Sequence, residues 1–252
     1  MPVAASIYYH VYQEGEKLPL VLLHGAGGNH LTWPSDIRRL AGYRVYALDM
    51  PGHGRSAGRG QQSISGYAQL VRDWMQAIDL HRGAFVGYSM GSAIALSLAL
   101  ESPEQVIGLG LLGAAAKMRV NPQLLEDTSS ATTFHNAVEQ IVDWSFSAQA
   151  DPRLKELVVQ RLAETRPSVL HGDFLACDSF DVSEQVSQVG CPTLVVCGEM
   201  DKMIPVRYAQ FLVENIAGAR LEVVPGAGHM VMQEQPQAVA RLLQQFMGQL
   251  SY

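Results

Sequence analysis

The sequence has few cysteines, no cluster of basic residues and no long apolar run. Its 252 residues include only Cys177, Cys191 and Cys197, too few and too irregularly spaced for a disulfide framework or a zinc site. The odd number leaves at least one free thiol, which favours a reducing compartment. No apolar run approaches the roughly 18 residues of a membrane helix, and the first residues lack the pattern of a signal peptide. We therefore expect a cytoplasmic protein that does not contact a membrane.

The charge balance argues against a nucleic-acid partner. Lysine and arginine number 18 and aspartate and glutamate 24, giving a formal net charge of -6. A protein that binds phosphate backbones needs a basic excess, which is missing. Hydrophobic residues at 48% and charged residues at 17% indicate one compact core, with an insertion allowed by the length. We therefore expect no nucleic-acid partner.

Strands and helices alternate along most of the chain. Continuous apolar runs bounded by glycine, proline and polar residues predict buried strands at 20–23, 43–48, the run before Gly87, 106–112, 193–197 and 220–224. Helices are predicted at 33–41, 65–80, from Ser89 to about 100, at 206–216 and at 236–250. Residues 7–13 with a polar turn at 14–17 predict an edge hairpin. The pattern predicts an α/β fold with a mostly parallel sheet flanked by helices, which binds ligands at the carboxyl ends of its strands.

The alternation stops for about seventy residues after 106–112. We predict a helical cap at 114–186, inserted after the sixth strand into a core domain made of 1–113 and 187–252. Within the cap, helices are predicted at 133–146, 152–164 and 167–177, the last two with proline at the first helical position. Asp181 and Glu184 have the spacing of a capping box, which predicts one more short helix.

One pentapeptide, Gly87-Tyr88-Ser89-Met90-Gly91, lies between a predicted strand and a helix rich in small residues. A serine at such a sharp turn has a strained backbone that exposes its Oγ above the sheet. The glycines allow the strand and helix backbones to approach closely. The alternative is an ordinary serine at a helix start. We predict that Ser89 is a nucleophile.

A serine nucleophile needs a base and a group that orients the base. Predicted strands end just before Asp201 and His229. His229 would accept the serine proton and return it to the leaving group, while Asp201 would hold the imidazole in the required tautomer. Glu199 competes with Asp201 for this role, and residues 113–116 offer no acid after the preceding strand.

An attacked carbonyl also needs two backbone donors for its developing negative charge. The amide of Met90, next to the nucleophile, is one predicted donor. The second is the amide of Ala26 in the glycine loop 25–28, with Gly27 as second choice. We expect the other histidines to be structural: His24 and His53 beside the site, His10, His30 and His81 on the surface, and His135 and His171 on solvent-facing positions of the cap.

These motifs together resemble the serine hydrolases of the α/β-hydrolase family. The resemblance runs from about residue 18 to 249 and rests on four segments in the family's order, which are His24 to Gly28, Asp49 to Ser56, Gly87 to Gly91, and Gly198-x-x-Asp201 with Gly228-His229. It implies a sheet of about eight strands with the cap covering the site. The chain departs from the family at its start, where only 7–13 reads as a strand, so the first edge strand is expected to be short or absent.

The reaction predicted from these residues is hydrolysis of a carboxylic ester through an acyl-enzyme. This reaction needs no cofactor and no metal, and we expect a monomer or homodimer that acts on a small-molecule ester. Related members of the family hydrolyse lactones, cleave carbon-carbon bonds or make peracids, and a ligand receptor on the same scaffold is a further alternative. Methionines near the catalytic loops favour a permissive apolar pocket, and Lys117 and Arg119 at the cap entrance are candidates for a substrate carboxylate or for a solvated hinge. The predicted substrate contacts are Gly27, Tyr88, Trp144 and Met230.

Overall fold

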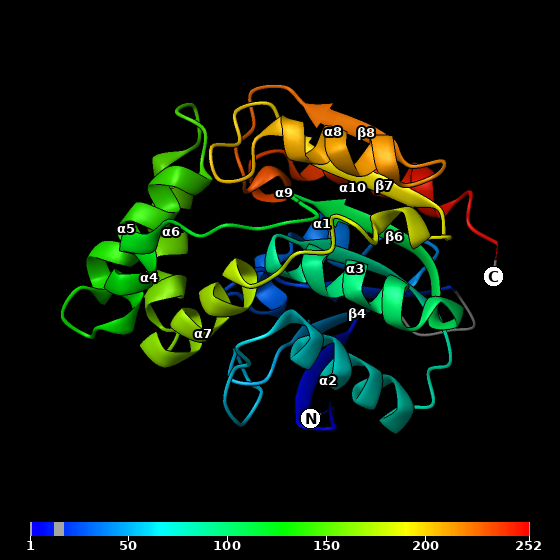
Figure 1. Cartoon of the computed structure of the whole chain (residues 1–252), viewed down its shortest axis with the longest axis horizontal. Helices are drawn as coiled ribbons and strands as arrows, with labels where there is room; N and C mark the ends of the chain where they lie inside the picture. The colour runs from blue at the N-terminus through cyan, green and yellow to red at the C-terminus, as the bar shows by residue number, and fades with distance from the viewer. Residues whose placement is uncertain (1, 13–17, 252) are drawn as a thin grey trace.

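A computed structural model describes residues 2–12 and 18–251, and its centre is a twisted sheet of eight strands (Figure 1). The strands in spatial order are β1 (Val3–Ala4), β2 (Ile7–Val11), β4 (Arg44–Asp49), β3 (Pro19–Leu23), β5 (Gly83–Tyr88), β6 (Val106–Leu112), β7 (Thr193–Gly198) and β8 (Arg220–Val224). All neighbours from β4 to β8 pair in parallel, whereas β1 with β2 and β2 with β4 are antiparallel. This confirms the predicted α/β-hydrolase fold.

The edge of the sheet differs from the predicted hairpin. Strand β2 pairs with β4 instead of with β3, the strand that follows it in sequence. The hairpin partner of β2 is β1, which has only two residues, so the first edge strand is present but short. The predicted turn at 14–17 lies outside the described residues. The residue types at 7–13 predict a strand, but they do not indicate which other strand it pairs with.

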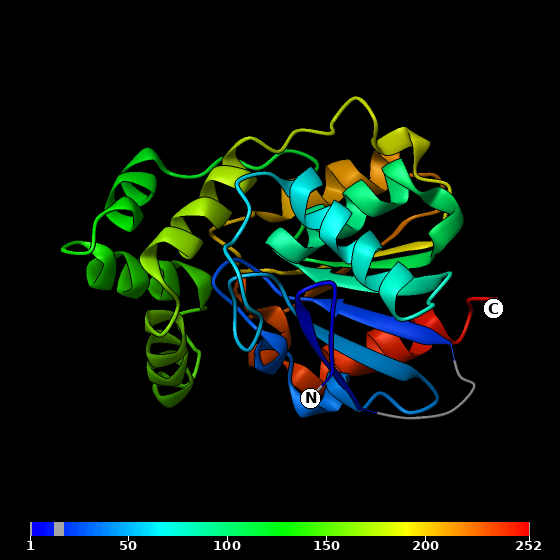
Figure 2. The same cartoon turned by 90° about the horizontal axis from the view of Figure 1, so that it is seen from below.

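Helices cover both faces of the sheet (Figure 2). On one face lie α2 (Ile64–Ala77), α3 (Met90–Glu101) and α8 (Val206–Asn215), and on the other lie α1 (Ser35–Arg38), α9 (Val231–Glu234) and α10 (Pro236–Met247). Strand β3 is buried along its whole length, as expected for a parallel strand covered on both sides. The predicted helix at 33–41 is shorter than expected, because a 3₁₀ turn at His30–Thr32 and the four residues of α1 replace it.

Four helices follow β6 and form a separate group at one end of the sheet, which we call the cap (Figure 1). They are α4 (Pro122–Ser129), α5 (Phe134–Ser145), α6 (Pro152–Ala163) and α7 (Pro167–Asp178). Helix α4 was not predicted, although Asn121 accepts a hydrogen bond from Gln123 N–H at its start and proline occupies its first position. The cap has its own apolar cluster, which also contacts Ala26 and Met230 of the core.

The predicted short helix after Asp181 is a 3₁₀ helix that begins only at Val186, and no capping box is present at its start in the described part of the chain. Asp181 accepts a hydrogen bond from Ser183 N–H and pairs with Lys117 at 2.5 Å, and a turn leads to a 3₁₀ helix at Val186–Gln188. The chain entering the cap and the chain leaving it run side by side here. Met118 N–H donates to the carbonyl of Phe180 and Val182 N–H to that of Ala116. We call these paired segments, 116–118 and 180–182, the neck. It lies inside the predicted cap limits, and the division into two domains stays a prediction.

Candidate active site

Ser89 occupies a sharp turn between β5 and α3. Its φ of 53° lies in the left-handed region that residues with a side chain rarely adopt. A Cβ at Gly87 would overlap the carbonyl of Gly91, and a Cβ at Gly91 would overlap that of Leu23, so both positions require glycine. Ser89 N–H donates to the carbonyl of Leu112 on β6 at 2.9 Å, which anchors the turn to the sheet.

The side chains of Asp201 and His229 converge on this serine. Nε2 of His229 lies 3.0 Å from Oγ of Ser89, and its Nδ1 lies 2.8 Å from Oδ2 of Asp201. The second oxygen of Asp201 accepts the amides of Met203 at 2.9 Å and Ile204 at 2.8 Å, which fixes the carboxylate. Both His229 and Asp201 are buried. Glu199, the competing acid, accepts a hydrogen bond from Gly226 N–H. Within the described residues it forms no hydrogen bond with the imidazole of His229.

Residues that sequence reasoning missed hold the histidine loop. Glu234 of α9 accepts the amide of Gly228 at 2.7 Å and that of Ser147, beyond the end of α5, at 3.2 Å. Met230 N–H donates to the carbonyl of Ser145 at 2.9 Å. The loop that carries His229 is thus bonded to the cap as well as to the core.

The two predicted oxyanion donors are both free. Within the described residues, no protein group accepts a hydrogen bond from the amide of Ala26 or from that of Met90, which begins α3. Gly27, the second choice, is wrong as a donor, because its amide already donates to Oδ2 of Asp173 at 2.8 Å. Its carbonyl accepts from the hydroxyl of Thr165 at 2.8 Å. The cap therefore holds both sides of the Gly27 residue.

Asp173 on α7 is fully buried and was not predicted. Its carboxylate accepts from the hydroxyl of Tyr67 at 2.5 Å and lies 2.7 Å from Nε2 of His53, in addition to the Gly27 bond. Burial alone disfavours a charge on His53, but the carboxylate of Asp173 outweighs burial and raises the pKa of His53. The signal in the sequence was a single acid within a predicted helix of mostly apolar residues. The structure shows that this helix is buried on most sides.

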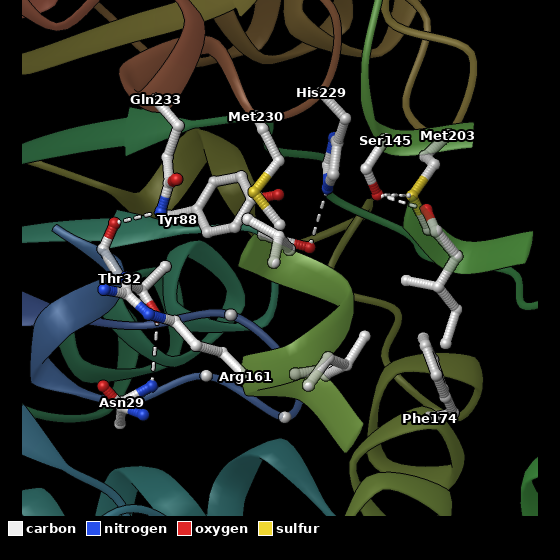
Figure 3. Close-up of a pocket in the computed structure, with 18 residues that line it drawn as sticks. Asn29, Thr32, Tyr88, Ser145, Arg161, Phe174, Met203, His229, Met230 and Gln233 are labelled. Atoms are coloured by element: carbon white, nitrogen blue, oxygen red, sulfur yellow. Dashed lines mark hydrogen bonds between the residues drawn. The ribbon is translucent and has the colours of Figure 1, made fainter. Parts of the chain in front are cut away.

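Two cavities meet at Ser89. The narrow cavity, of about 70 Å³, has mainly apolar walls from the cap, with Arg161 and Gln233 among its polar residues (Figure 3). The wide cavity, of about 410 Å³, lies beneath the neck. Both are lined by Ala26, Ser89, Phe174, Met203 and His229.

The four predicted substrate contacts divide between these cavities. Gly27, Tyr88 and Met230 line the narrow cavity, and Trp144 lines the wide one. Of the methionines near the catalytic loops, Met118, Met203 and Met230 line a cavity, whereas Met200 is exposed.

One prediction for the histidines is wrong. His30 is buried, because its ring and its amide both hydrogen bond to Oδ1 of Asp49, at 2.8 and 2.6 Å. His10 and His171 are half-buried, and His171 lies 3.3 Å from the hydroxyl of Thr128. His81 and His135 are exposed as expected.

The parallel sheet, the serine turn and the histidine and acid on later strands are the combination found in α/β hydrolases. A model of the alpha/beta hydrolase family matches residues 20–242, and the chain belongs to this family. It is 29% identical over 257 residues to a pimeloyl-[acyl-carrier protein] methyl ester esterase of Yersinia enterocolitica, covering 96% of this chain and 97% of that protein. It is 28% identical to a 2-hydroxy-6-oxo-6-phenylhexa-2,4-dienoate hydrolase of Burkholderia cepacia, covering 94% and 90%.

Solved structures agree with this assignment. A hydrolase of Pseudomonas aeruginosa superposes with a TM-score of 0.88 at 26% identity, covering 96% of this chain and 94% of that one. The enol-lactonase of Burkholderia xenovorans has the same fold, with a TM-score of 0.91 at 21% identity and 96% coverage of each chain. In the described part of the chain, no group of three or more potential metal ligands occurs, and no helix has the length and apolarity needed to cross a bilayer.

Proposed function

We propose that the chain hydrolyses carboxylic esters through Ser89, His229 and Asp201. The observation that carries this proposal is the continuous hydrogen-bonded series from Ser89 Oγ through His229 to Asp201, next to two free amides. A buried carboxylate on Nδ1 keeps the proton there, which leaves Nε2 free to accept the serine proton. The attacked carbonyl oxygen would then receive hydrogen bonds from Ala26 and Met90.

The reaction proceeds in two halves. Ser89 Oγ adds to the ester carbon while its proton moves to His229, and His229 then protonates the departing alcohol, leaving an acyl-enzyme. Water enters, gives a proton to His229 and attacks the acyl carbon. The bond to Oγ then breaks, His229 returns the proton to Oγ, and the acid is released. The methyl ester esterase named among the relatives supports an ester as the substrate.

Other reactions remain compatible with the same residues. The Burkholderia cepacia relative is named for hydrolysis of a dienoate, and lactone opening, peracid formation or slow turnover by a ligand receptor would use the same serine. A cytoplasmic location and a monomeric or dimeric state are also predictions.

The proposal is tested with short-chain p-nitrophenyl esters and the variant Ser89→Ala. Loss of the nucleophile is expected to lower kcat by about 10⁴-fold or more. A fluorophosphonate should label the wild type and not Ser89→Ala, because the serine oxygen displaces fluoride. Ser97→Ala, on the same helix, is the control for folding and should retain activity.

Three outcomes would contradict the proposal. Unchanged hydrolysis by Ser89→Ala would exclude the serine mechanism. A single slow turnover in the wild type would favour a receptor, and a diketone or enol-lactone preferred by orders of magnitude would replace simple esters as the substrate class.

A further inference from the structure

The lining of the two cavities has a charge opposite to that of the whole chain. The protein has six more acidic than basic residues, yet no aspartate or glutamate is among the described residues that line either cavity. The wide cavity is lined by Lys117, Arg119 and Lys202, and the narrow cavity by Arg161. A local excess of positive charge in a cleft attracts anions, even when the molecule as a whole is negative.

The cations of the wide cavity differ in what they contact. Lys117 pairs with Asp181 at 2.5 Å, so its charge is balanced. Among the residues that the structure describes, Arg119 donates only to the backbone carbonyls of Met118, at 3.1 Å, and Asp178, at 2.6 Å, which are uncharged. Lys202 has no hydrogen bond or ion pair within the described residues. Arg119 and Lys202 therefore bring two positive charges without an anionic partner.

The neighbouring acids do not cancel these charges by contact. The Asp178 carboxylate accepts the amide of Val120 at 3.0 Å and forms no ion pair in the described part of the chain. Asp181 is already paired with Lys117. Neither acid lines the cavity.

Most of the remaining lining of the wide cavity is apolar, with Asn121 and Tyr208 among its polar residues. Leu124, Trp144, Phe174 and Ile204 line the same cavity as Ser89 and the basic residues. A ligand that matches this surface has an apolar segment next to the ester and a negative charge at its far end. The apolar and basic lining of the wide cavity is therefore complementary to an amphipathic ester.

On the assumption that the proposed esterase function is correct, we propose that the wide cavity selects esters that carry an anionic group. Arg119 and Lys202 bind that group, which is a carboxylate or a phosphate, while the apolar segment lies against Trp144 and Phe174. A guanidinium binds either anion through two parallel N–H donors, and an ammonium adds a point charge.

The test compares methyl esters of equal chain length that differ only at the far end. Methyl octanoate, methyl 8-hydroxyoctanoate, monomethyl octanedioate and methyl 8-phosphooxyoctanoate end in a methyl, hydroxyl, carboxylate and phosphate group. We expect kcat/KM at low salt to be about tenfold or more higher for an anionic ester than for the hydroxyl ester, mainly through KM. This ratio should fall at 0.5 M NaCl, because Arg119 and Lys202 are exposed and salt screens the charges of exposed groups. The two anionic esters distinguish a carboxylate from a phosphate.

Variants identify the residues responsible. The double variant Arg119→Gln/Lys202→Gln should reduce the anionic to hydroxyl ratio toward one. The control Arg82→Gln/Arg153→Gln changes the net charge equally at exposed positions outside both cavities and should keep the ratio. Using a ratio within each variant removes any general effect of Lys202 on the adjacent Asp201.

The outcomes separate this inference from the proposed function. Serine-dependent hydrolysis of all four esters with equal kcat/KM would overturn the charge selectivity and leave the esterase intact. Loss of the ratio in Arg161→Gln, with retention in the Arg119/Lys202 double variant, would also overturn it, because the charge would then be recognised in the narrow cavity. Hydrolysis that does not depend on Ser89 would instead contradict the proposed function.

Discussion

Gly113, the first residue after β6, lies against the imidazole of His229. Its φ is +55°, and a Cβ at this position would lie 2.8 Å from Cε1 of His229. A gap that only glycine leaves open therefore determines where the ring can sit. The positions of the proposed catalytic groups depend on residues that carry no reactive atom.

We expect Gly113→Ala to lower kcat by about 100-fold, because a displacement of roughly 1 Å at a reacting group has effects of that size. The control is Gly218→Ala, where φ is +72° and no atom lies within 4 Å of the added Cβ. Both variants should lose about 1 kcal/mol of stability from the unfavourable backbone conformation. Equal activity of the two variants, measured on a p-nitrophenyl ester, would contradict the role given to Gly113.

His24 makes the protein less stable in acid. Burial, followed by the nearby charge of His53, lowers the pKa of His24 to about 4. Nδ1 of the neutral ring lies 2.7 Å from the carbonyl oxygen of Gly25, and Nε2 accepts a hydrogen bond from Met50 N–H at 3.0 Å. Protonation of Nε2 would remove the second hydrogen bond.

The unfolded chain binds a proton at His24 near pH 6.5, whereas the folded chain does so near pH 4, so acid favours unfolding between these values. We expect His24 to reduce the free energy of unfolding by about 2 kcal/mol between pH 7 and pH 5. His53, with its raised pKa, acts in the opposite direction. Urea unfolding of the wild type and His24→Asn isolates the first effect, and NMR titration of the His24 ring should give a midpoint near 4. A wild type and variant with parallel pH dependence would disprove it.

At the scale of elements, helix α7 contributes to a loop of the core. Asp173 accepts the amide of Gly27, and Thr165, just before the helix, donates to the carbonyl of the same residue. Gly27 follows Ala26, whose amide is a proposed oxyanion donor. The cap thus orients part of the reaction centre in addition to lining the substrate cavities.

We expect Asp173→Ala to lower kcat tenfold or more, since misplacement of an oxyanion donor has effects of about 100-fold to 1000-fold when complete. The variant should also lose about 3 kcal/mol of stability, because it leaves buried partners without an acceptor. Activity is measured below the melting temperature found by circular dichroism, and Asp173→Asn, which keeps one acceptor, should be intermediate. Asp178→Ala on the same helix is the control. A folded Asp173→Ala with normal kcat would limit Asp173 to stability.

Elements and residues differ in how far the sequence predicts them. The order of strands and helices and the positions of Ser89, Asp201 and His229 were predictable, because each depends on a few consecutive residues at a strand end. Asp173 was not, because its partners Tyr67, His53 and Gly27 are 106, 120 and 146 residues away in sequence. The burial of His30 was missed for the same reason, since it depends on Asp49 at the end of β4, 19 residues away in sequence.

At the scale of the molecule, loops at the end of the sheet and helices of the cap together line both cavities. The proposed reacting groups follow the carboxyl ends of β3, β5, β7 and β8, while α5, α6 and α7 supply Ile141, Val158, Leu162 and Phe174 to the narrow cavity. The proposed charge selectivity, by contrast, comes from Arg119, just after the neck segment 116–118, and from Lys202 in the loop after β7. Reaction type and substrate choice are therefore assigned to different parts of the chain.

The neck has a consequence for how such enzymes diversify. The hydrogen bonds between 116–118 and 180–182 hold the two ends of the cap next to each other. The core is therefore connected to the cap at the same two neighbouring points, whatever segment lies between them. The entropy of closing a longer or shorter insertion changes only slowly with its length. A foreign cap joined at these residues would leave the register of β6 and β7 undisturbed. It would, however, have to bring its own acceptor for the amide of Gly27.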